Sequence, residues 1–240
     1  MSKQRKIEIL DDREHALKRP NVYIGAVKKI QEKRYIVRDN KFVETELEYV
    51  PGLVKIFEEI LDNSVDAFVD NNFNGNPRID IVLDDKSFSV KDNGVGIPNT
   101  KHFNKILNKE VWMCESAWGT LKAGSNFDDS DRKSAGANGM GAALTNYFSK
   151  VFVGKNGNSG KEIIYTSIEN ATKIKTQEKK TTKSGVEVYV EPDFGRFEVN
   201  KFTENEKVAI YSRIIMLSLT YPEIKFYFNQ KLIKSTEIDF

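Results

Sequence analysis

The chain has 240 residues, of which 39% are hydrophobic and 30% are charged, and its formal net charge is +2. This length allows one large domain or two small ones with a real core, and the charge alone is too weak to predict nucleic-acid binding. The sequence has no apolar run of about 18 residues and no apolar N-terminal stretch, so we expect no membrane span, membrane partner or signal peptide. The single cysteine, Cys114, cannot form an internal disulfide, which favours a cytoplasmic location. The two histidines, His15 and His102, lie far apart without cysteine partners, so a zinc site is not expected.

Taken in chain order, the first clear element is a helix over residues 52–70, which begins at Pro51 and Gly52. Its apolar face is formed at helical spacing by Leu53, Phe57, Ile60, Leu61, Ser64 and Phe68. Residues 78–83 and 87–90 are predicted to be strands around a tight turn, and Pro98 closes a glycine-rich turn over residues 92–98. Residues 99–135 are the least regular segment, which indicates a long loop with short helical pieces.

In the second half, glycines lead into a helix within residues 136–149, and a further helix is predicted over residues 205–220. Strands are predicted at 151–154, 162–168 and 186–192, and a last hairpin at 224–233. The Lys-rich residues 173–183 are more typical of a solvated loop or hairpin than of a DNA-binding patch. Because strands outnumber helices and the helices fall between groups of strands, we expect an α+β fold with helices on one face of a sheet.

The polar side of the helix at 52–70 groups Glu59, Asp62, Asn63 and Asp66, with no Lys or Arg expected near enough to pair with them. Glu59 and Asn63 are one turn apart, so their side chains point into the same volume. A carboxylate can accept a proton from water, and an amide oxygen is a suitable ligand for Mg²⁺. On this stretch alone, a solvated helix face is the more economical interpretation.

Two glycine-containing turns could approach a ligand closely. In DNGVGIP, residues 92–98, Asp92 follows a strand and could accept a hydrogen bond from an exocyclic amine such as that of adenine, although an ordinary Asp-Asn-Gly turn fits equally well. In GANGMGAAL, three glycines precede a helix whose first N–H groups could bind phosphate. The spacing matches neither a Walker A loop nor the G-x-G-x-x-G dinucleotide motif.

The order of these motifs carries more information than any one of them. A helix with E-x-x-D-N, a strand–turn–strand unit, D-x-G-x-G, a long loop and a G-x-x-G-x-G helix start follow one another. This order resembles the ATP-binding fold shared by gyrase, the heat-shock chaperone of ninety kilodaltons, histidine kinases and mismatch-repair MutL proteins, the GHKL superfamily. The resemblance implies that residues 1–240 form one GHKL (Bergerat) ATP-binding domain, a two-layer α+β sandwich with a mixed sheet and helices on one face.

Longer segments resemble the ATPase domain of type II DNA topoisomerases, above all the large subunit of T-even-like phage enzymes, then eukaryotic topoisomerase II and, more weakly, gyrase B. They are EHALKRPNVYIG (14–25), YVPGLVKIFEEILDNSVDA (49–67), LKAGSNFDD (121–129), NGMGAALTNYFS (138–149) and YPEIKFYFNQKLI (221–233). The resemblance implies an ATP-hydrolysing topoisomerase that uses ATP and Mg²⁺. ATP would join two copies into a homodimer that captures a DNA duplex, and other topoisomerase subunits or domains would be partners.

The resemblance also implies a division of the chain. Residues 1–20 would form a dimerisation arm and residues 99–135 would include the ATP lid. Transducer, toprim and cleavage domains would lie outside this chain, which by itself would bind ATP and hydrolyse it slowly or not at all. Another GHKL ATPase, such as a chaperone or mismatch-repair protein, and a non-hydrolysing nucleotide-binding module remain as alternatives.

The resemblance assigns roles to residues of this chain. Glu59 would be the general base for the attacking water, Asn63 would bind Mg²⁺, and Asp92 would bind the adenine amino group. Asp62 and Asp66 would support these groups. The remaining nucleotide-binding residues would be Gly96, Ile97, Lys122, Ser125, Asn126, Gly136, Asn138, Gly139, Met140 and Gly141. The chain departs from the family pattern at Val95, Ala143 and Val186, where Arg, Lys and Thr are common. Without the Thr, fewer contacts to adenine are expected. Without the Lys, neutralisation of the negative charge of the phosphates is expected to depend more on Mg²⁺ or on Lys122.

Overall fold

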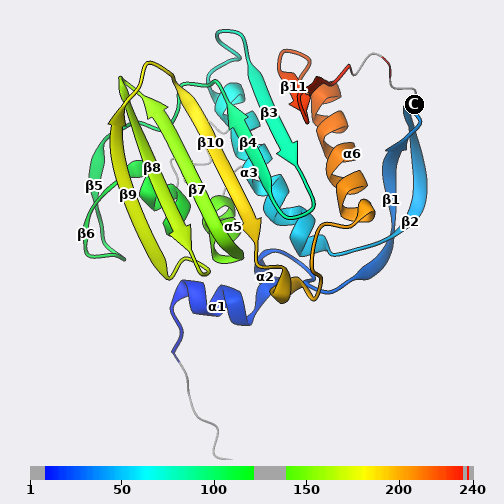
Figure 1. Cartoon of the computed structure of the whole chain (residues 1–240), viewed down its shortest axis with the longest axis horizontal. Helices are drawn as coiled ribbons and strands as arrows, with labels where there is room; N and C mark the ends of the chain where they lie inside the picture. The colour runs from blue at the N-terminus through cyan, green and yellow to red at the C-terminus, as the bar shows by residue number, and fades with distance from the viewer. Residues whose placement is uncertain (1–8, 122–138, 235–236, 238–240) are drawn as a thin grey trace, which may run out of the picture.

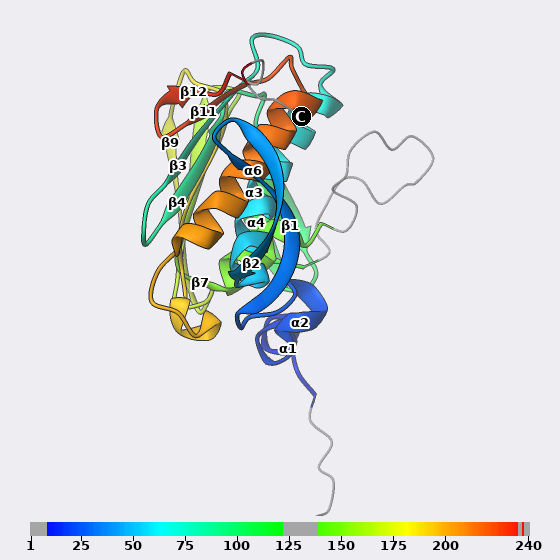
Figure 2. The same ribbon diagram turned by 90° about the vertical axis from the view of Figure 1, so that its right-hand side faces the viewer.

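The computed structural model describes residues 9–121, 139–234 and 237 of the chain. These residues form two layers, a large twisted sheet and a set of helices that cover one of its faces (Figures 1 and 2). The helices are α1 (Asp12–Lys18), α2 (Pro20–Tyr23), α3 (Pro51–Asp70), α4 (Met113–Gly119), α5 (Gly141–Tyr147) and α6 (Glu204–Thr220), with a 3₁₀ turn at Phe194–Phe197. The strands are β1 (Ile30–Arg38), β2 (Lys41–Tyr49), β3 (Arg78–Leu83), β4 (Phe88–Asp92), β5 (Lys101–Asn104), β6 (Lys109–Trp112), β7 (Ser149–Asn158), β8 (Lys161–Ile168), β9 (Lys173–Lys180), β10 (Gly185–Pro192), β11 (Lys225–Phe228) and β12 (Lys231–Leu232).

The described part of the main sheet has eight strands in the order β12-β11-β3-β4-β10-β7-β8-β9. Strands β11 and β3 run parallel, whereas the other neighbours are antiparallel, so the sheet is mixed. This arrangement confirms the predicted α+β class with helices on one face. The Lys-rich segment forms β9, an edge strand whose only sheet neighbour among the described residues is β8, so the hairpin interpretation of that segment is confirmed.

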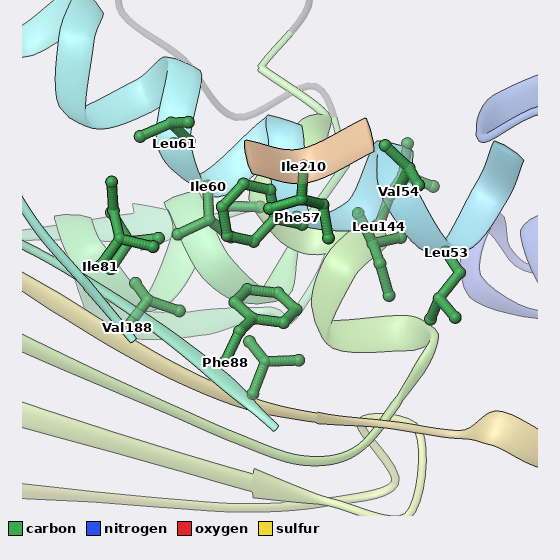
Figure 3. Packing of buried hydrophobic residues seen from close by; sticks show 14 of the residues in the cluster. Leu53, Val54, Phe57, Ile60, Leu61, Ile81, Phe88, Leu144, Val188 and Ile210 are labelled. Atoms are coloured by element: carbon green, nitrogen blue, oxygen red, sulfur yellow. The ribbon is translucent and has the colours of Figure 1, made fainter. Parts of the chain in front are cut away.

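The long helix α3 lies against the middle of the sheet (Figure 1). Its first residue is Pro51, which suits the first turn of a helix because a proline there lacks only an N–H that would have no partner. The apolar face predicted from the sequence is buried, and the rings of Phe57 on α3 and Phe88 on β4 pack edge to face with centroids 5.2 Å apart (Figure 3). Each such fully buried aromatic side chain stabilises the fold by about 1.5–3 kcal/mol.

Helix α6 packs beside α3 and is tied to its start by a buried carboxylate. Glu206 is fully buried; one of its oxygens accepts a hydrogen bond from the Val50 N–H at 2.8 Å, and the other caps α6 through the Thr203 N–H at 2.8 Å. The Val50 N–H precedes α3, where backbone donors lack helical partners. One carboxylate therefore fixes the relative position of two helix starts.

Two hairpins are additional to the predicted elements. Strands β1 and β2 pair only with each other and lie outside the main sheet, across α6 (Figure 2). Most side chains of β1 are exposed, so the strand lacks the strict alternation of apolar and polar residues that marks a half-buried strand. Strands β5 and β6 form a short hairpin followed by α4, within the segment predicted to be a loop with helical pieces. None of the described helices has the length and apolar character needed to cross a membrane.

Candidate functional site

The start of α5 lies directly against the polar side of α3. A Cβ added at Gly141, the first residue of α5, would overlap Glu59 Oε2 and lie 2.7 Å from Glu59 Cδ. A side chain at this position would displace the carboxylate, so glycine is what allows Glu59 to lie against the start of α5. Two motifs that are far apart in the sequence, the acidic helix and the glycine-rich helix start, meet at this contact.

Helix α5 is held on α3 by a buried hydroxyl. Thr145 is fully buried, and its Oγ1 lies 2.9 Å from the Ile56 carbonyl oxygen on α3 and 3.0 Å from the Gly141 carbonyl oxygen. Ala142 and Ala143 are also buried, and their small side chains allow the two helices to approach closely. The contact between Glu59 and Gly141 is thus supported by packing from the same short helix.

Asp92 ends strand β4 and is buried, with 4% of its surface exposed. Its Oδ1 accepts hydrogen bonds from the N–H groups of Gly94 at 2.9 Å and Val186 at 3.1 Å, and its Oδ2 accepts one from Ser64 Oγ at 3.1 Å. Burial raises the pKa of Asp92, and these hydrogen bonds offset the rise only in part. A carboxylate has about four acceptor positions, so one remains for a donor from outside the protein.

The glycine-rich turn after Asp92 is fixed by Asn156 on β7. Gly96 has φ +72°, and a Cβ there would overlap the Gly157 carbonyl oxygen. Asn156 is fully buried; its Oδ1 accepts from the Ile97 N–H at 2.7 Å, and its Nδ2 donates to the Ile97 carbonyl at 2.8 Å and to Asn99 Oδ1 at 2.9 Å. Both backbone polar groups of Ile97 are therefore occupied, which leaves its side chain for any contact with a ligand.

The Gly185-Val186 pair lies beside Asp92, as its likeness to a family Gly-Thr pair predicts. Gly185 has φ +118°, and a Cβ there would overlap the Asp92 carbonyl oxygen. Val186 contacts the Asp92 carboxylate through its backbone N–H and has no hydroxyl to offer. The hydroxyl that bonds the Asp92 side chain comes instead from Ser64 on α3.

The prediction that no cation lies near the polar side of α3 is wrong. Lys55 Nζ lies 2.5 Å from Glu59 Oε1, one helical turn away, and Arg213 Nη2 on α6 lies 2.8 Å from Asp62 Oδ1. The Lys55 pair was visible in the sequence as an i,i+4 spacing. The Arg213 pair was not, because it depends on how α6 packs against α3.

Asp62 faces a cleft between β1, α3 and α6, with a volume of about 330 Å³. The cleft is lined by Arg34, Tyr35, Lys55, Glu58, Asp62, Ala209, Ser212, Arg213 and Met216. Burial raises the pKa of Glu58, although the charges of Arg213 and Arg34 act against this rise. Lys55 lines the cleft and also pairs with Glu59, whereas neither Glu59 nor Gly141 is among the lining residues.

Asn63 is exposed, and the structure gives its amide no hydrogen bond to any other described residue. Among the described residues, no group of three or more His, Cys, Asp or Glu side chains could hold a metal ion. A hard cation such as Mg²⁺ keeps several waters and takes one or two protein ligands together with phosphate oxygens. Asn63 and Glu59, one helical turn apart, could supply one or two protein ligands of this kind. They do not by themselves complete the coordination of a metal ion.

The structure brings Glu59, Asn63, Asp66, Gly139, Met140 and Gly141 onto or beside α3, and it fixes Asp92, Gly96 and Ile97 in one turn. The predicted residues Lys122, Ser125, Asn126, Gly136 and Asn138 lie outside the described residues. Sequence reasoning missed Lys55, Ser64, Thr145 and Asn156. Ser64 left one signal, because a hydroxyl on an otherwise apolar helix face needs a hydrogen-bond partner.

Comparison with known proteins gives a consistent result. Residues 49–196 match the family model described as "Histidine kinase-, DNA gyrase B-, and HSP90-like ATPase". The DNA topoisomerase large subunit of Enterobacteria phage T4 is 36% identical over 230 residues, which cover 95% of this chain and 43% of that protein. The chain thus spans less than half the length of this relative.

Solved structures with a similar fold are also those of topoisomerases. The ATPase region of Saccharomyces cerevisiae topoisomerase II superimposes with a TM-score of 0.84 and 29% identity, over 95% of this chain and 61% of that one. The ATPase and transducer domains of topoisomerase II from Balamuthia mandrillaris give a TM-score of 0.88 and 26% identity, over 98% of this chain and 62% of that one.

Proposed function

This chain belongs to the family of histidine kinase-, DNA gyrase B- and HSP90-like ATPases, and from this membership we propose that it is the ATP-driven gate of a type II DNA topoisomerase. ATP binds between α3 and the start of α5, and its hydrolysis resets the gate. The observation that carries this proposal is the contact of Glu59 with Gly141, because it sets a carboxylate beside a helix start built for close backbone approach. The likeness to topoisomerases in sequence and in structure supports it.

Asp92 takes the adenine end of the nucleotide. Its carboxylate is buried and held by three donors, and its remaining acceptor position receives the exocyclic amine. A site without a fixed acceptor would not distinguish adenine from guanine in this way, whereas the Asp92 carboxylate favours the base that presents an N–H₂ group there. The apolar surroundings of Asp92 strengthen this hydrogen bond.

At the other end, Glu59 accepts the proton of the water that attacks the γ-phosphate. Backbone N–H groups at Gly139, Met140 and Gly141 contact the phosphates, and the same role is proposed for Gly136 and Asn138, which lie outside the described residues. Asn63 holds Mg²⁺, which supplies positive charge to the phosphates when it is bound. Asp66 on the same side of α3 supports Asn63, and Lys122, Ser125 and Asn126 close over the ribose and phosphates.

In the longer protein, ATP binding joins two copies of this domain and encloses a DNA duplex. Residues 1–20 form the dimerisation arm, and other topoisomerase domains or subunits cut and reseal a second duplex. Support for this part of the proposal comes from the relatives, which are named as topoisomerases and exceed this chain in length.

Calorimetric titration with a non-hydrolysable ATP analogue and Mg²⁺ tests the proposal. We expect binding by the unchanged chain, loss of binding in Asp92→Asn, and unchanged binding in Glu59→Gln. The same Glu59→Gln change should lower phosphate release by the longer protein by about 10²–10⁴-fold, the scale of general-base catalysis, and leave a measurable residual rate. A chain that fails to bind the analogue contradicts the proposed site, and a Glu59→Gln protein with normal turnover contradicts the assigned base.

A further inference from the structure

The two oxygens of the Glu59 carboxylate have different neighbours. Oε1 lies 2.5 Å from Lys55 Nζ, and Oε2 fills the space beside Gly141. The glycine leaves room for the carboxylate but offers no side chain to hold it. Among the ion pairs and hydrogen bonds of the described residues, Lys55 is the partner that restrains Glu59.

Lys55 is itself held from two sides. Burial alone would lower its pKa, but the hydrogen bond to Glu59 and the charges of Glu59, Glu58 and Asp62 outweigh burial, so the pKa of Lys55 is raised. The lysine therefore stays charged wherever the carboxylates are ionised. Lys55 lines the cleft together with Glu58 and Asp62, and its ammonium group lies 2.5 Å from Glu59 Oε1.

We propose that Lys55 is a positioning residue, which orients the Glu59 carboxylate so that Oε2 faces the start of α5. This inference rests on the proposed function, in which Glu59 is the general base. A long glutamate side chain has several staggered rotamers, and an ion pair at one oxygen reduces the number it can adopt. Without Lys55, Glu59 would turn away from the acids that share its face of α3, and Oε2 would leave Gly141.

The simpler interpretation is an ordinary surface pair, which stabilises the helix slightly and contributes nothing to function. The chain offers such a pair for comparison. Lys173 and Glu169 are also four residues apart, with Nζ and Oε1 separated by 2.8 Å, but their side chains are 64% and 56% exposed. The Glu59 side chain is 24% exposed and packs on another helix, so its orientation is coupled to the fold.

The first experiment measures how mobile the Glu59 carboxyl group is, and it needs neither nucleotide nor turnover. Carbon-13 relaxation of the Glu59 carboxyl carbon is compared in the unchanged chain, Lys55→Met, Lys55→Arg and Lys173→Met. We expect an ordered carboxyl group in the unchanged chain and in Lys173→Met, fast motion in Lys55→Met, and order largely restored by Arg, which keeps the charge. Equal order in Lys55→Met and the unchanged chain would overturn the proposal.

The second experiment is a double-mutant cycle on phosphate release by the longer protein. We expect Lys55→Met to lower kcat about tenfold, with a change in KM for ATP below about twofold, because misplacement of a reacting group lowers the rate more than binding. In a Glu59→Gln background the same change should have no further effect. A full additional loss there would show that Lys55 acts independently of Glu59.

The outcomes separate this inference from the proposed function. If Glu59→Gln keeps normal turnover, the assignment of the base is wrong, whatever Lys55 does. If Glu59→Gln loses most of its turnover while Lys55→Met keeps normal kcat and an ordered carboxyl group, the base assignment stands and the positioning role is wrong. Circular dichroism of each variant confirms that a change in rate is not a loss of fold.

Discussion

Glu59 on α3 occupies the space that a side chain at residue 141 would need. The glycine at the start of α5 is therefore favoured by the position of a residue on a different helix. Residue 141 has an ordinary helical position and no positive φ, so strain does not explain it. The preference for glycine comes instead from the close approach of the Glu59 carboxylate to the backbone of residue 141.

Gly141→Ala should remove activity while leaving the fold. The added methyl group would overlap Glu59 Oε2 and force the carboxylate into another rotamer. Turnover by the longer protein should fall at least about a hundredfold, the scale expected when a reacting group is misplaced by about 1 Å. Gly195→Ala is the matched control, because its Cβ would have a nearest neighbour at 3.5 Å. Equal turnover in both variants would contradict the role of this contact.

Asp92→Asn should affect the stability of the fold and the binding of the ATP analogue in opposite directions. Because burial raises the pKa of Asp92 above 3.8, the folded protein holds this proton more tightly than the unfolded chain. The contribution of Asp92 to stability therefore falls as pH rises from the unfolded pKa through the folded pKa, and its full cost is present at neutral pH. We expect a higher Tm than the unchanged chain at pH 7, a difference that disappears at acidic pH, and no binding of the ATP analogue.

Thermal unfolding over a series of pH values measures the first part, and calorimetry measures the second. If Asp92→Asn had a lower Tm at every pH, the hydrogen bonds to the ionised carboxylate would outweigh its burial. Asp80→Asn is a suitable control because Asp80 lies on the neighbouring strand β3 and pairs with Arg78 at the surface.

Asn156→Ala should loosen the turn after Asp92. The change removes three hydrogen bonds and leaves the Ile97 N–H without its partner, which should destabilise the fold by about 2–4 kcal/mol. Affinity for the ATP analogue should fall as well, because the turn carries Gly96 and Ile97. Asn158→Ala removes two exposed bonds, from Nδ2 to the Val95 carbonyl at 2.7 Å and from Ser159 Oγ to Oδ1 at 2.6 Å, and should cost less than about 1 kcal/mol because water can replace both partners. Denaturant unfolding compares the two.

Arg213→Met should weaken the fold without affecting nucleotide affinity. Its ion pair with Asp62 joins α6 to α3 on the cleft side, away from Gly141. The two side chains are about one-third exposed, so solvent screening limits the loss to about 1 kcal/mol. Chemical unfolding measures the first effect and calorimetric titration the second. A large loss of affinity would mean that Asp62 does support the nucleotide-binding residues through this pair.

The sequence predicted the elements whose residues pack on the core, such as α3, α6 and β10, because their apolar side chains repeat with the period of the element. It did not predict β1 and β2, which bury few side chains and pair only with each other. The order of motifs pointed to Glu59, Asn63 and Asp92, but local spacing could not show that Arg213 reaches Asp62 or that Asn156 supports Ile97. Those contacts join residues that meet only after the sheet and helices have packed.

Strand β9 forms an edge of the main sheet that disfavours the addition of a strand from a second molecule. Lys173, Lys175, Lys179 and Lys180 lie along this exposed strand, and a second molecule approaching edge to edge would bring the same charges into opposition. Lysine-rich borders of this kind keep β-sheets from fusing into continuous fibres. Pairing of two copies of this domain edge to edge through β9 is therefore disfavoured.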